Sequence, residues 1–310
     1  MIGVLDIFAY LALSYILYRF IRGIYIIIYP YLIARPKNLH KLAGGAKWAI
    51  VTGSTDGIGK EYAIQLAQKG FNLILISRTQ SKLDSVKAEI SKEFKNIEIE
   101  TIVYNFTNAN LNDYKKEILP MIEKKEIGIL VNNVGLYYDY PEMFHKVDLQ
   151  RTADIAIVNT VPVTCLTAAI LPQMLKRHSG IIINISSGLS YAKLPYVTTY
   201  SASKLYINHL TSILRSEYSN SGITIQTLCP NIVSTNMSKM EESFFILNVK
   251  KMVQSSIKTI GIIDECSGTI QHQIQSSVFG LPEFFLNFGL KFQVKEFKKV
   301  ADAERKKVDA

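Results

Sequence analysis

Hydrophobic residues beyond residue 46 occur in short runs that are apolar at nearly every position, and longer amphipathic stretches such as 60–69 and 80–94 separate them. Short apolar runs are typical of strands covered on both faces, whereas the longer stretches have the length of crossover helices. The sequence predicts strands at residues 47–52, 72–77, 97–104, 127–132, 180–186 and 222–228. Their alternation with helices predicts right-handed βαβ units, and hence one α/β domain with a doubly wound parallel sheet over about residues 46–275.

The first 34 residues follow a different pattern. Residues 2–18 contain Asp6 as their only charge, and a second apolar stretch covers residues 24–34. As a helix, the first stretch would rise about 26 Å, just short of the roughly 30 Å hydrocarbon layer of a bilayer. We therefore predict a membrane anchor over residues 1–34, as one span, a hairpin or an in-plane helix. The alternative is a pair of buried core helices, but these segments have no polar face.

Charge changes directly after this segment, at Arg35, Lys37, Lys41 and Lys47. Positive residues beside a span favour the cytoplasmic side of a membrane, so the soluble domain is expected in the cytosol. Residues 276–310 are predicted to form an amphipathic C-terminal extension. Its phenylalanine-rich part, residues 278–294, either packs on the domain or a dimer partner, or lies in the bilayer surface beside the active-site mouth.

Composition narrows the classes of partner and site. The 310 residues carry a net charge of +9, which favours phosphorylated ligands or anionic lipid, and the scattered lysines argue against nucleic acid. Three dispersed cysteines fit a reducing compartment and core packing rather than a disulfide framework. No cluster of histidine, cysteine or carboxylate residues has ligand spacing, so no metal site is predicted.

The first predicted strand runs into a glycine-rich turn, TGSTDGIG at residues 52–59, and then into a helix. Gly53, Gly57 and Gly59 permit a tight turn and a close approach of the backbone to a pyrophosphate at the helix N-terminus. The second predicted strand ends at Ser77, and Arg78 follows it. An NAD-binding domain has an acidic residue near this position, whereas arginine suits the 2′-phosphate of NADP. We therefore expect NADPH as the cofactor.

Two further strands end in polar residues. The fourth ends in the motif NNVG, residues 132–135, which would therefore lie at the sheet edge where doubly wound sheets bind ligands. The fifth ends near Ser187, and Tyr200 and Lys204 follow on one face of the next helix. A phenol has a pKa near 10, which a neighbouring ammonium lowers. A serine hydroxyl can hold a substrate oxygen in line with the phenol, and Asn159 on the preceding helix can supply a further polar group.

Together, TGSTDGIG, NNVG, Asn159, Ser187 and YSASK resemble the short-chain dehydrogenase/reductase family over nearly all of residues 46–275. The resemblance implies a Rossmann-type sheet of about seven strands, the last near Thr269–Gln273, and hydride transfer from NADPH to a ketone. It implies that Tyr200 is the proton donor and that Lys204 holds the nicotinamide ribose and lowers the pKa of the phenol. Ser187 would position the carbonyl oxygen, and Asn159 would support a proton-relay water.

Carried over position by position, the same resemblance assigns cofactor binding to Gly53, Ser54, Asp56, Gly57, Ile58, Gly59, Arg78, Asn105, Asn132, Gly135, Tyr200, Lys204 and Val233. Two positions depart from the family's pattern. Asn105 replaces a common aspartate after strand three, and Asn231 replaces a frequent glycine after Pro230. An asparagine can still donate and accept hydrogen bonds toward the cofactor.

Within the family, the motifs and the anchor look like the very-long-chain 3-oxoacyl-CoA reductases, also described as 17β-hydroxysteroid dehydrogenases. This implies reduction of a long-chain 3-oxoacyl-CoA in fatty acid elongation, at the endoplasmic reticulum membrane, by a protein that forms a homodimer. A ketosteroid substrate is the alternative. A catalytically weak membrane scaffold that retains the fold is a further one. Lys306 and Lys307 lie one position too far from the terminus for a dilysine retention signal, so retention would depend on the anchor.

Overall fold

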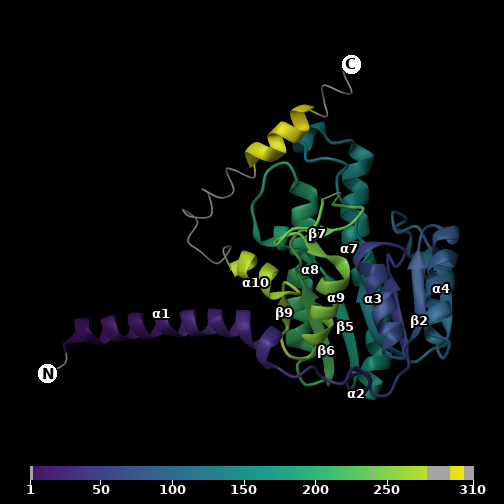
Figure 1. Ribbon diagram of the computed structural model, residues 1–310, viewed down its shortest axis with the longest axis horizontal. Helices are drawn as coiled ribbons and strands as arrows, with labels where there is room; N and C mark the ends of the chain where they lie inside the picture. The colour runs from purple at the N-terminus through teal and green to yellow at the C-terminus, as the bar shows by residue number, and fades with distance from the viewer. Residues whose placement is uncertain (1–2, 239, 278–293, 304–310) are drawn as a thin grey trace.

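A central sheet of seven parallel strands, in the order β3-β2-β1-β4-β5-β6-β9, forms the body of the protein (Figure 1). A computed structural model describes residues 3–238, 240–277 and 294–303. The strands are β1 (Trp48–Thr52), β2 (Asn72–Ser77), β3 (Ile99–Val103), β4 (Ile127–Asn132), β5 (Gly180–Ile185), β6 (Ile223–Leu228) and β9 (Glu265–Cys266). The predicted doubly wound α/β fold is confirmed, and the first six strands lie within two residues of their predicted bounds.

Helices cover both faces of this sheet. One face carries α3 (Gly57–Gln68), α4 (Gln80–Glu93) and α9 (Val249–Lys258). The other carries α5 (Leu111–Asp113), the π-turn Tyr114–Ile118, α6 (Leu119–Glu123), α7 (Leu149–Arg177) and α8 (Thr198–Glu217). Alternate residues of one strand enter the two cores: Val51 packs with the first set of helices and Ile50 with the second. Because both faces are covered, the central strands β1, β4 and β5 are apolar at most positions.

The remaining described elements are short. They are α2 (Leu39–Leu42), α10 (Ile270–Ser277), the 3₁₀ turns Phe144–Lys146 and Gly188–Tyr191, and the two-residue strands β7 (Val233–Ser234) and β8 (Leu247–Asn248), which pair with each other. A further helix covers residues 294–303. Most of the phenylalanine-rich part of the C-terminal extension, residues 278–293, lies outside the described residues, and so do Lys306 and Lys307.

The predicted position of the seventh strand is wrong. The strand is β9, Glu265–Cys266, which pairs with Thr227 and Leu228 of β6. Residues 269–273 belong instead to the start of helix α10. Gly268 has φ +87°, which turns the chain out of the sheet, and the Thr269 hydroxyl accepts a hydrogen bond from the backbone N–H of His272. A left-handed glycine followed by a capping threonine ends a strand and starts a helix.

The N-terminal segment is one continuous helix. Helix α1 (Val4–Ile28) continues through a π-turn, Tyr29–Ile33, and projects away from the sheet domain (Figure 1). None of the α1 residues is buried, so the alternative of buried core helices is wrong for this segment. Its 25 residues rise about 37 Å, enough to cross a bilayer. Helix α7 is also long and apolar enough to span, but half of it is buried in the domain.

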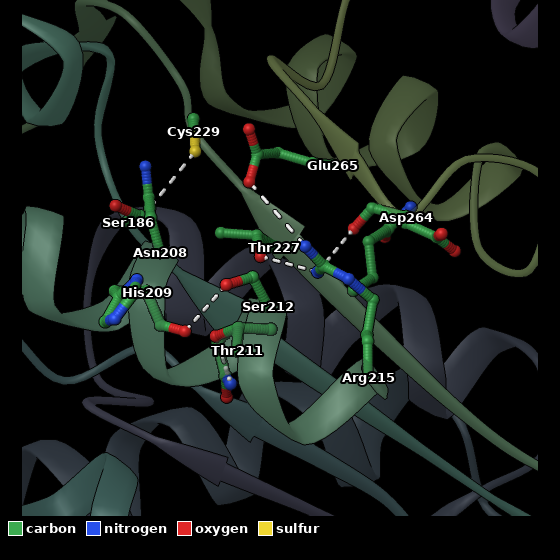
Figure 2. Close-up of polar contacts among 12 residues, drawn as sticks. Ser186, Asn208, His209, Thr211, Ser212, Arg215, Thr227, Cys229, Asp264 and Glu265 are labelled. Carbon is green, nitrogen blue, oxygen red and sulfur yellow. Dashed lines mark hydrogen bonds and ion pairs between the residues drawn. The ribbon is translucent and has the colours of Figure 1, made fainter. Parts of the chain in front are cut away.

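Helix α8 is fixed to the far edge of the sheet by Arg215. Its guanidinium donates to the Thr227 hydroxyl at 2.9 Å and to the Asp264 carbonyl at 3.1 Å, and it lies 3.8 Å from the Glu265 carboxylate (Figure 2). Nearer the start of the helix, Asn208 contacts the Cys229 thiol at 3.5 Å. These contacts hold α8 against β6 and β9, so the face that carries Tyr200 and Lys204 has a defined position.

Candidate active site

The glycine-rich loop between β1 and α3 needs glycine at several positions, because of its backbone conformation or its close neighbours. Gly53 and Gly57 have φ of +62° and +52°, in the left-handed region that glycine adopts without strain. A Cβ on Gly59 would collide with the Asn133 amide and the Gly53 carbonyl. The Asn133 amide donates to the carbonyls of Thr52 at 2.9 Å and Gly53 at 3.1 Å. Sequence analysis did not single out Asn133, although it is the second amide of the NNVG motif.

Several features of this loop fit a dinucleotide. The loop leads into the N-terminus of α3, where backbone N–H groups and the helix dipole favour a phosphate. The Asp56 carboxylate caps this helix and accepts from the Gly57 N–H at 2.7 Å. Ser54 is fully buried, and its hydroxyl has no hydrogen-bond partner among the described residues. A buried hydroxyl without a partner is costly, so a ligand atom that bonds to Ser54 would be stabilising.

The other predicted cofactor residues lie in three environments. Arg78 is exposed directly after β2, and Asn105 is exposed after β3, where its side chain accepts from the Thr107 N–H at 3.2 Å. Ile58 is partly buried in the glycine loop and packs on the core, and Val233 is buried in β7. A cavity of about 600 Å³ is lined by the start of α3 and by the segment after β7.

Asn132 does not face this edge of the sheet. Its buried amide donates to the Thr167 hydroxyl at 3.0 Å and to Asn184 Oδ1 at 2.8 Å. The side chain therefore joins β4, β5 and α7 in the interior, which differs from the expected wall of the cofactor site. The alternation of side chains along a strand turns Asn132 inward and leaves Asn133 to hold the glycine loop.

Asn159 connects α7 to the loop after β4. Its Oδ1 accepts from the Leu136 N–H at 2.8 Å, and its amide donates to the Leu136 carbonyl at 3.1 Å and to the Ser203 hydroxyl at 2.9 Å. A Cβ on Gly135 would lie 3.2 Å from Asn159 Oδ1 and 3.4 Å from Lys204 Nζ. Gly135 thus allows the loop after β4 to pass close to both side chains.

Lys204 is buried one helical turn from Tyr200. Its Nζ donates to the Ile185 carbonyl at 3.0 Å, at the end of β5, and lies 5.7 Å from the centre of the Tyr200 ring. Burial lowers the pKa of this ammonium to about 8, because the charged form loses hydration. A cation held at this distance electrostatically favours ionisation of the nearby phenol.

Tyr200 is buried with its phenol near the side chain of Ser187. Burial raises the pKa of Tyr200, and the neighbouring Ser187 hydroxyl lowers it. Ser187 precedes the 3₁₀ turn Gly188–Tyr191, and its own hydroxyl accepts from the Leu189 N–H at 3.2 Å. The predicted group of Asn159, Ser187, Tyr200 and Lys204 is therefore brought together at one edge of the sheet.

Sequence analysis did not identify Tyr137 and Tyr138 as part of this site. The Tyr138 hydroxyl accepts from the Thr199 N–H at 2.8 Å and so secures the first turn of α8. Tyr137 packs against Tyr200, and burial raises its pKa above the ordinary value for a phenol. Around them lies an apolar cluster of Leu136, Tyr137, Tyr138, Val147, Ile155, Leu189, Ala192, Leu194, Val197 and Tyr200, against which Val294 and Phe297 of the helix at residues 294–303 pack. The only sequence signal was the pair of aromatic residues that follows NNVG.

Comparison with known proteins agrees with this geometry. The family model of short chain dehydrogenases matches residues 47–244. A very-long-chain 3-oxoacyl-CoA reductase from Caenorhabditis briggsae is 46% identical over 280 residues, which cover 89% of this chain and 88% of that protein. A putative steroid dehydrogenase from Caenorhabditis elegans is 44% identical over 294 residues, with 94% and 93% covered.

Solved structures show the same fold. A short-chain dehydrogenase from Sphingobium yanoikuyae in complex with NADPH is 26% identical, with a TM-score of 0.61, and the match covers 68% of this chain and 82% of that one. More than half of the chain matches the family model, and relatives of more than 40% identity cover most of its length. The chain therefore belongs to the short-chain dehydrogenase family, and it is a nicotinamide-dependent oxidoreductase.

Proposed function

We propose that this protein uses NADPH to reduce the 3-keto group of a long-chain acyl-CoA to a hydroxyl group. The observation that carries the proposal is that Ser187, Tyr200 and the buried Lys204 lie together at the sheet edge where the glycine-rich loop ends. The curated relatives named very-long-chain 3-oxoacyl-CoA reductase support the choice of substrate, since they match most of the chain.

The proposed mechanism assigns a separate task to each side chain. NADPH, when bound, supplies the hydride that reaches the carbonyl carbon. Ser187 and Tyr200 hydrogen-bond to the carbonyl oxygen, which orients the substrate and stabilises the charge that develops there. Tyr200 then transfers its proton to this oxygen. Lys204 favours the resulting phenolate electrostatically, because its ammonium is near the ring in a poorly hydrated site.

The remaining residues hold these groups and the cofactor. Asn159 fixes the loop after β4 through Leu136, and a water bound near it would return a proton to Tyr200. The glycine loop and the buried Ser54 hydroxyl would hold the pyrophosphate region. Arg78 is exposed at the end of β2, where a charge-assisted bond to the 2′-phosphate would select NADPH.

A lipophilic substrate fits the surroundings of Tyr200. The apolar cluster that includes Tyr137, Leu189 and Leu194 provides an apolar wall beside the reacting phenol. A fatty acyl chain loses contact with water there, at about 25 cal/mol for each Å² of apolar surface that becomes buried. A ketosteroid is the second candidate, because several relatives are named putative steroid dehydrogenases.

We also propose where the protein acts and how it assembles. Helix α1 would span the endoplasmic reticulum membrane, and the basic residues that follow it would keep the domain in the cytosol. A homodimer would form along α7 and α8. Leu205, Tyr206 and Ile213 are exposed on α8, and an apolar helix face of this kind suits contact with a second copy.

The test is NADPH oxidation by the detergent-solubilised full chain, with a long-chain 3-oxoacyl-CoA and a ketosteroid assayed in parallel. The proposal expects turnover with the acyl-CoA at a kcat/KM at least about tenfold above that for the steroid, a difference of about 1.4 kcal/mol in transition-state binding. Turnover of the steroid alone would show that the substrate is a ketosteroid rather than an acyl-CoA, and it would leave the proposed mechanism unchanged. Turnover of neither substrate would contradict the proposal.

A further inference from the structure

Asn231 occupies the position where the family resemblance leads one to expect a glycine, and its side chain joins two parts of the fold. On one side its amide is 3.0 Å from Gln275 Oε1, 3.2 Å from the His272 carbonyl and 3.3 Å from the Ser276 hydroxyl. All three acceptors belong to α10. A single amide group thus holds one side of this short helix against the chain that leaves β6.

On its other side, Asn231 packs against the turn that carries the catalytic serine. A Cβ on Gly188 would collide with Asn231 Oδ1, so the two residues are in close contact. The Gly188 N–H also donates to the Pro230 carbonyl at 2.8 Å. Gly188 directly follows Ser187, whose side chain lies near the Tyr200 phenol. This turn therefore connects the asparagine to the surroundings of the phenol.

Helix α10 is held at a second point by the inner end of the anchor. Gln273 Oε1 accepts from the Tyr31 hydroxyl at 3.1 Å and from the Ser267 N–H at 2.9 Å. Tyr31 lies in the π-turn that ends the N-terminal helix, and α10 lies beside the base of that helix (Figure 1). A continuous series of polar contacts therefore runs from Tyr31 through Gln273 and α10 to Asn231 and Gly188.

We propose that Asn231 is a positioning residue for Ser187, and that α10 links this turn to the inner end of the membrane anchor. A hydrogen bond from a hydroxyl group weakens quickly beyond about 3 Å, so small shifts of the turn would strongly change what Ser187 can offer to the phenol or to the carbonyl oxygen. With glycine at position 231, the backbone bond from Gly188 to Pro230 would remain, but the turn would lose its lateral support. The side chain at position 231 thus determines how the Ser187 side chain is oriented relative to Tyr200. This inference rests on the roles proposed above for Ser187 and Tyr200.

The test compares Asn231→Gly, Asn231→Ala and Tyr31→Phe with the parent, all as full-length chains in detergent. Asn110→Ala is the control, because the Asn110 side chain also bonds to a neighbouring residue, here by accepting from the Asn112 N–H at 3.0 Å, but lies on an exposed turn before α5. Hydrogen–deuterium exchange without substrate gives the first readout. We expect exchange about tenfold faster at residues 186–191 and 270–277 in both Asn231 variants. Tyr31→Phe should accelerate exchange in 270–277 more than in 186–191, and Asn110→Ala should change neither segment.

The second readout is the pH dependence of the oxidative reaction, hydroxyacyl substrate with NADP⁺, which requires the ionised phenol. Because the neighbouring Ser187 hydroxyl lowers the pKa of Tyr200, a shift of Ser187 away from the phenol should move the half-maximal pH of kcat upward by about half a unit in the Asn231 variants. The KM for NADP⁺ should stay within about twofold, because the glycine loop is unchanged.

Unchanged exchange at residues 186–191 in both Asn231 variants would overturn the inference, whatever the activity. An unchanged half-maximal pH, with only a lower melting temperature, would also overturn it and leave Asn231 a purely structural residue. If the parent protein reduces no ketone, the proposed function is contradicted. The hydrogen–deuterium exchange experiment would still show whether Asn231 stabilises the turn that follows Ser187.

Discussion

Tyr137 packs edge-to-face on Tyr200, with ring centres 4.7 Å apart and ring planes at 88°. Contacts of this geometry contribute about 0.5–1.5 kcal/mol beyond the area that they bury. Tyr137→Ala should therefore loosen the catalytic phenol and lower kcat about tenfold, whereas Tyr137→Phe keeps the ring and should retain most of the activity. Steady-state kinetics with one 3-oxoacyl-CoA measures both. Equal losses in the two variants would mean that the Tyr137 hydroxyl, and not its packing, matters.

Tyr200→Phe removes the transferable proton and keeps the ring. Turnover should fall by at least about a thousandfold, because general acid catalysis of this kind contributes about 10²–10⁴ and the hydroxyl that would hold the carbonyl oxygen together with Ser187 is lost as well. Binding of NADPH should change little, since the glycine loop and Arg78 are untouched. Cofactor fluorescence measures binding separately from rate. A Phe variant with a near-parental rate would exclude Tyr200 as the acid.

Arg78→Ala tests the choice of cofactor. Of the two cofactors, only NADPH has a 2′-phosphate that can form a charge-assisted bond with the guanidinium. Loss of Arg78 should therefore weaken the binding of NADPH by about 1.5–3 kcal/mol and hardly change the binding of NADH. Dissociation constants for both cofactors, measured by fluorescence titration, give the comparison. Lys82→Ala, an exposed change on the following helix, is the control. Equal weakening of the binding of both cofactors would show that Arg78 does not recognise the 2′-phosphate.

Lys204 should make stability depend on pH. Its pKa is lowered from 10.5 to about 8 in the fold, so burial of the charge costs free energy wherever the folded state holds the proton. Below pH 8 this cost is complete. Between pH 8 and 10.5 the unfolded chain binds the proton and the folded chain does not, so the stability of the parent rises with pH.

Lys204→Met removes this cost and the bond to the Ile185 carbonyl, and the net gain should be about 2 kcal/mol at pH 7. The variant should therefore melt at a higher temperature than the parent and be inactive. Thermal melts at pH 7 and pH 10 provide the measurement, and the difference should shrink at the higher pH. A variant that is less stable than the parent at pH 7 would contradict the lowered pKa of Lys204.

The proposed membrane anchor can be tested by cell fractionation. Full-length protein should remain with membranes after an alkaline wash, because the 25 residues of α1 offer mostly apolar, exposed side chains to lipid. Deletion of residues 1–28 keeps Tyr31 and should release the protein only partly if residues 278–294 also contact the bilayer. Full-length protein in the soluble fraction after the wash would contradict the anchor.

The order of elements was readable from the sequence because each strand and helix has a local cause. Strands buried on both faces are apolar at most positions, and a glycine-rich turn between a strand and a helix is typical of a dinucleotide-binding loop. The same reasoning predicted that Ser187, Tyr200 and Lys204 lie together, since the i, i+4 spacing and the strand end each restrict where a side chain can go. The seventh strand was missed. Two paired residues carry no periodic pattern, and Gly268 with Thr269 redirects the chain before the predicted position.

Tertiary structure alone decided which polar residues face the site. Asn132 and Asn133 are adjacent and chemically identical, yet one is bonded inside the domain and the other holds the glycine loop. Tyr137 reaches Tyr200, and Asn231 reaches Gly188 and α10, through contacts between segments that are distant in the chain. Local sequence limits what each residue can donate, accept or bury. Its partner depends on how the whole sheet and its helices pack, which no short stretch of sequence contains.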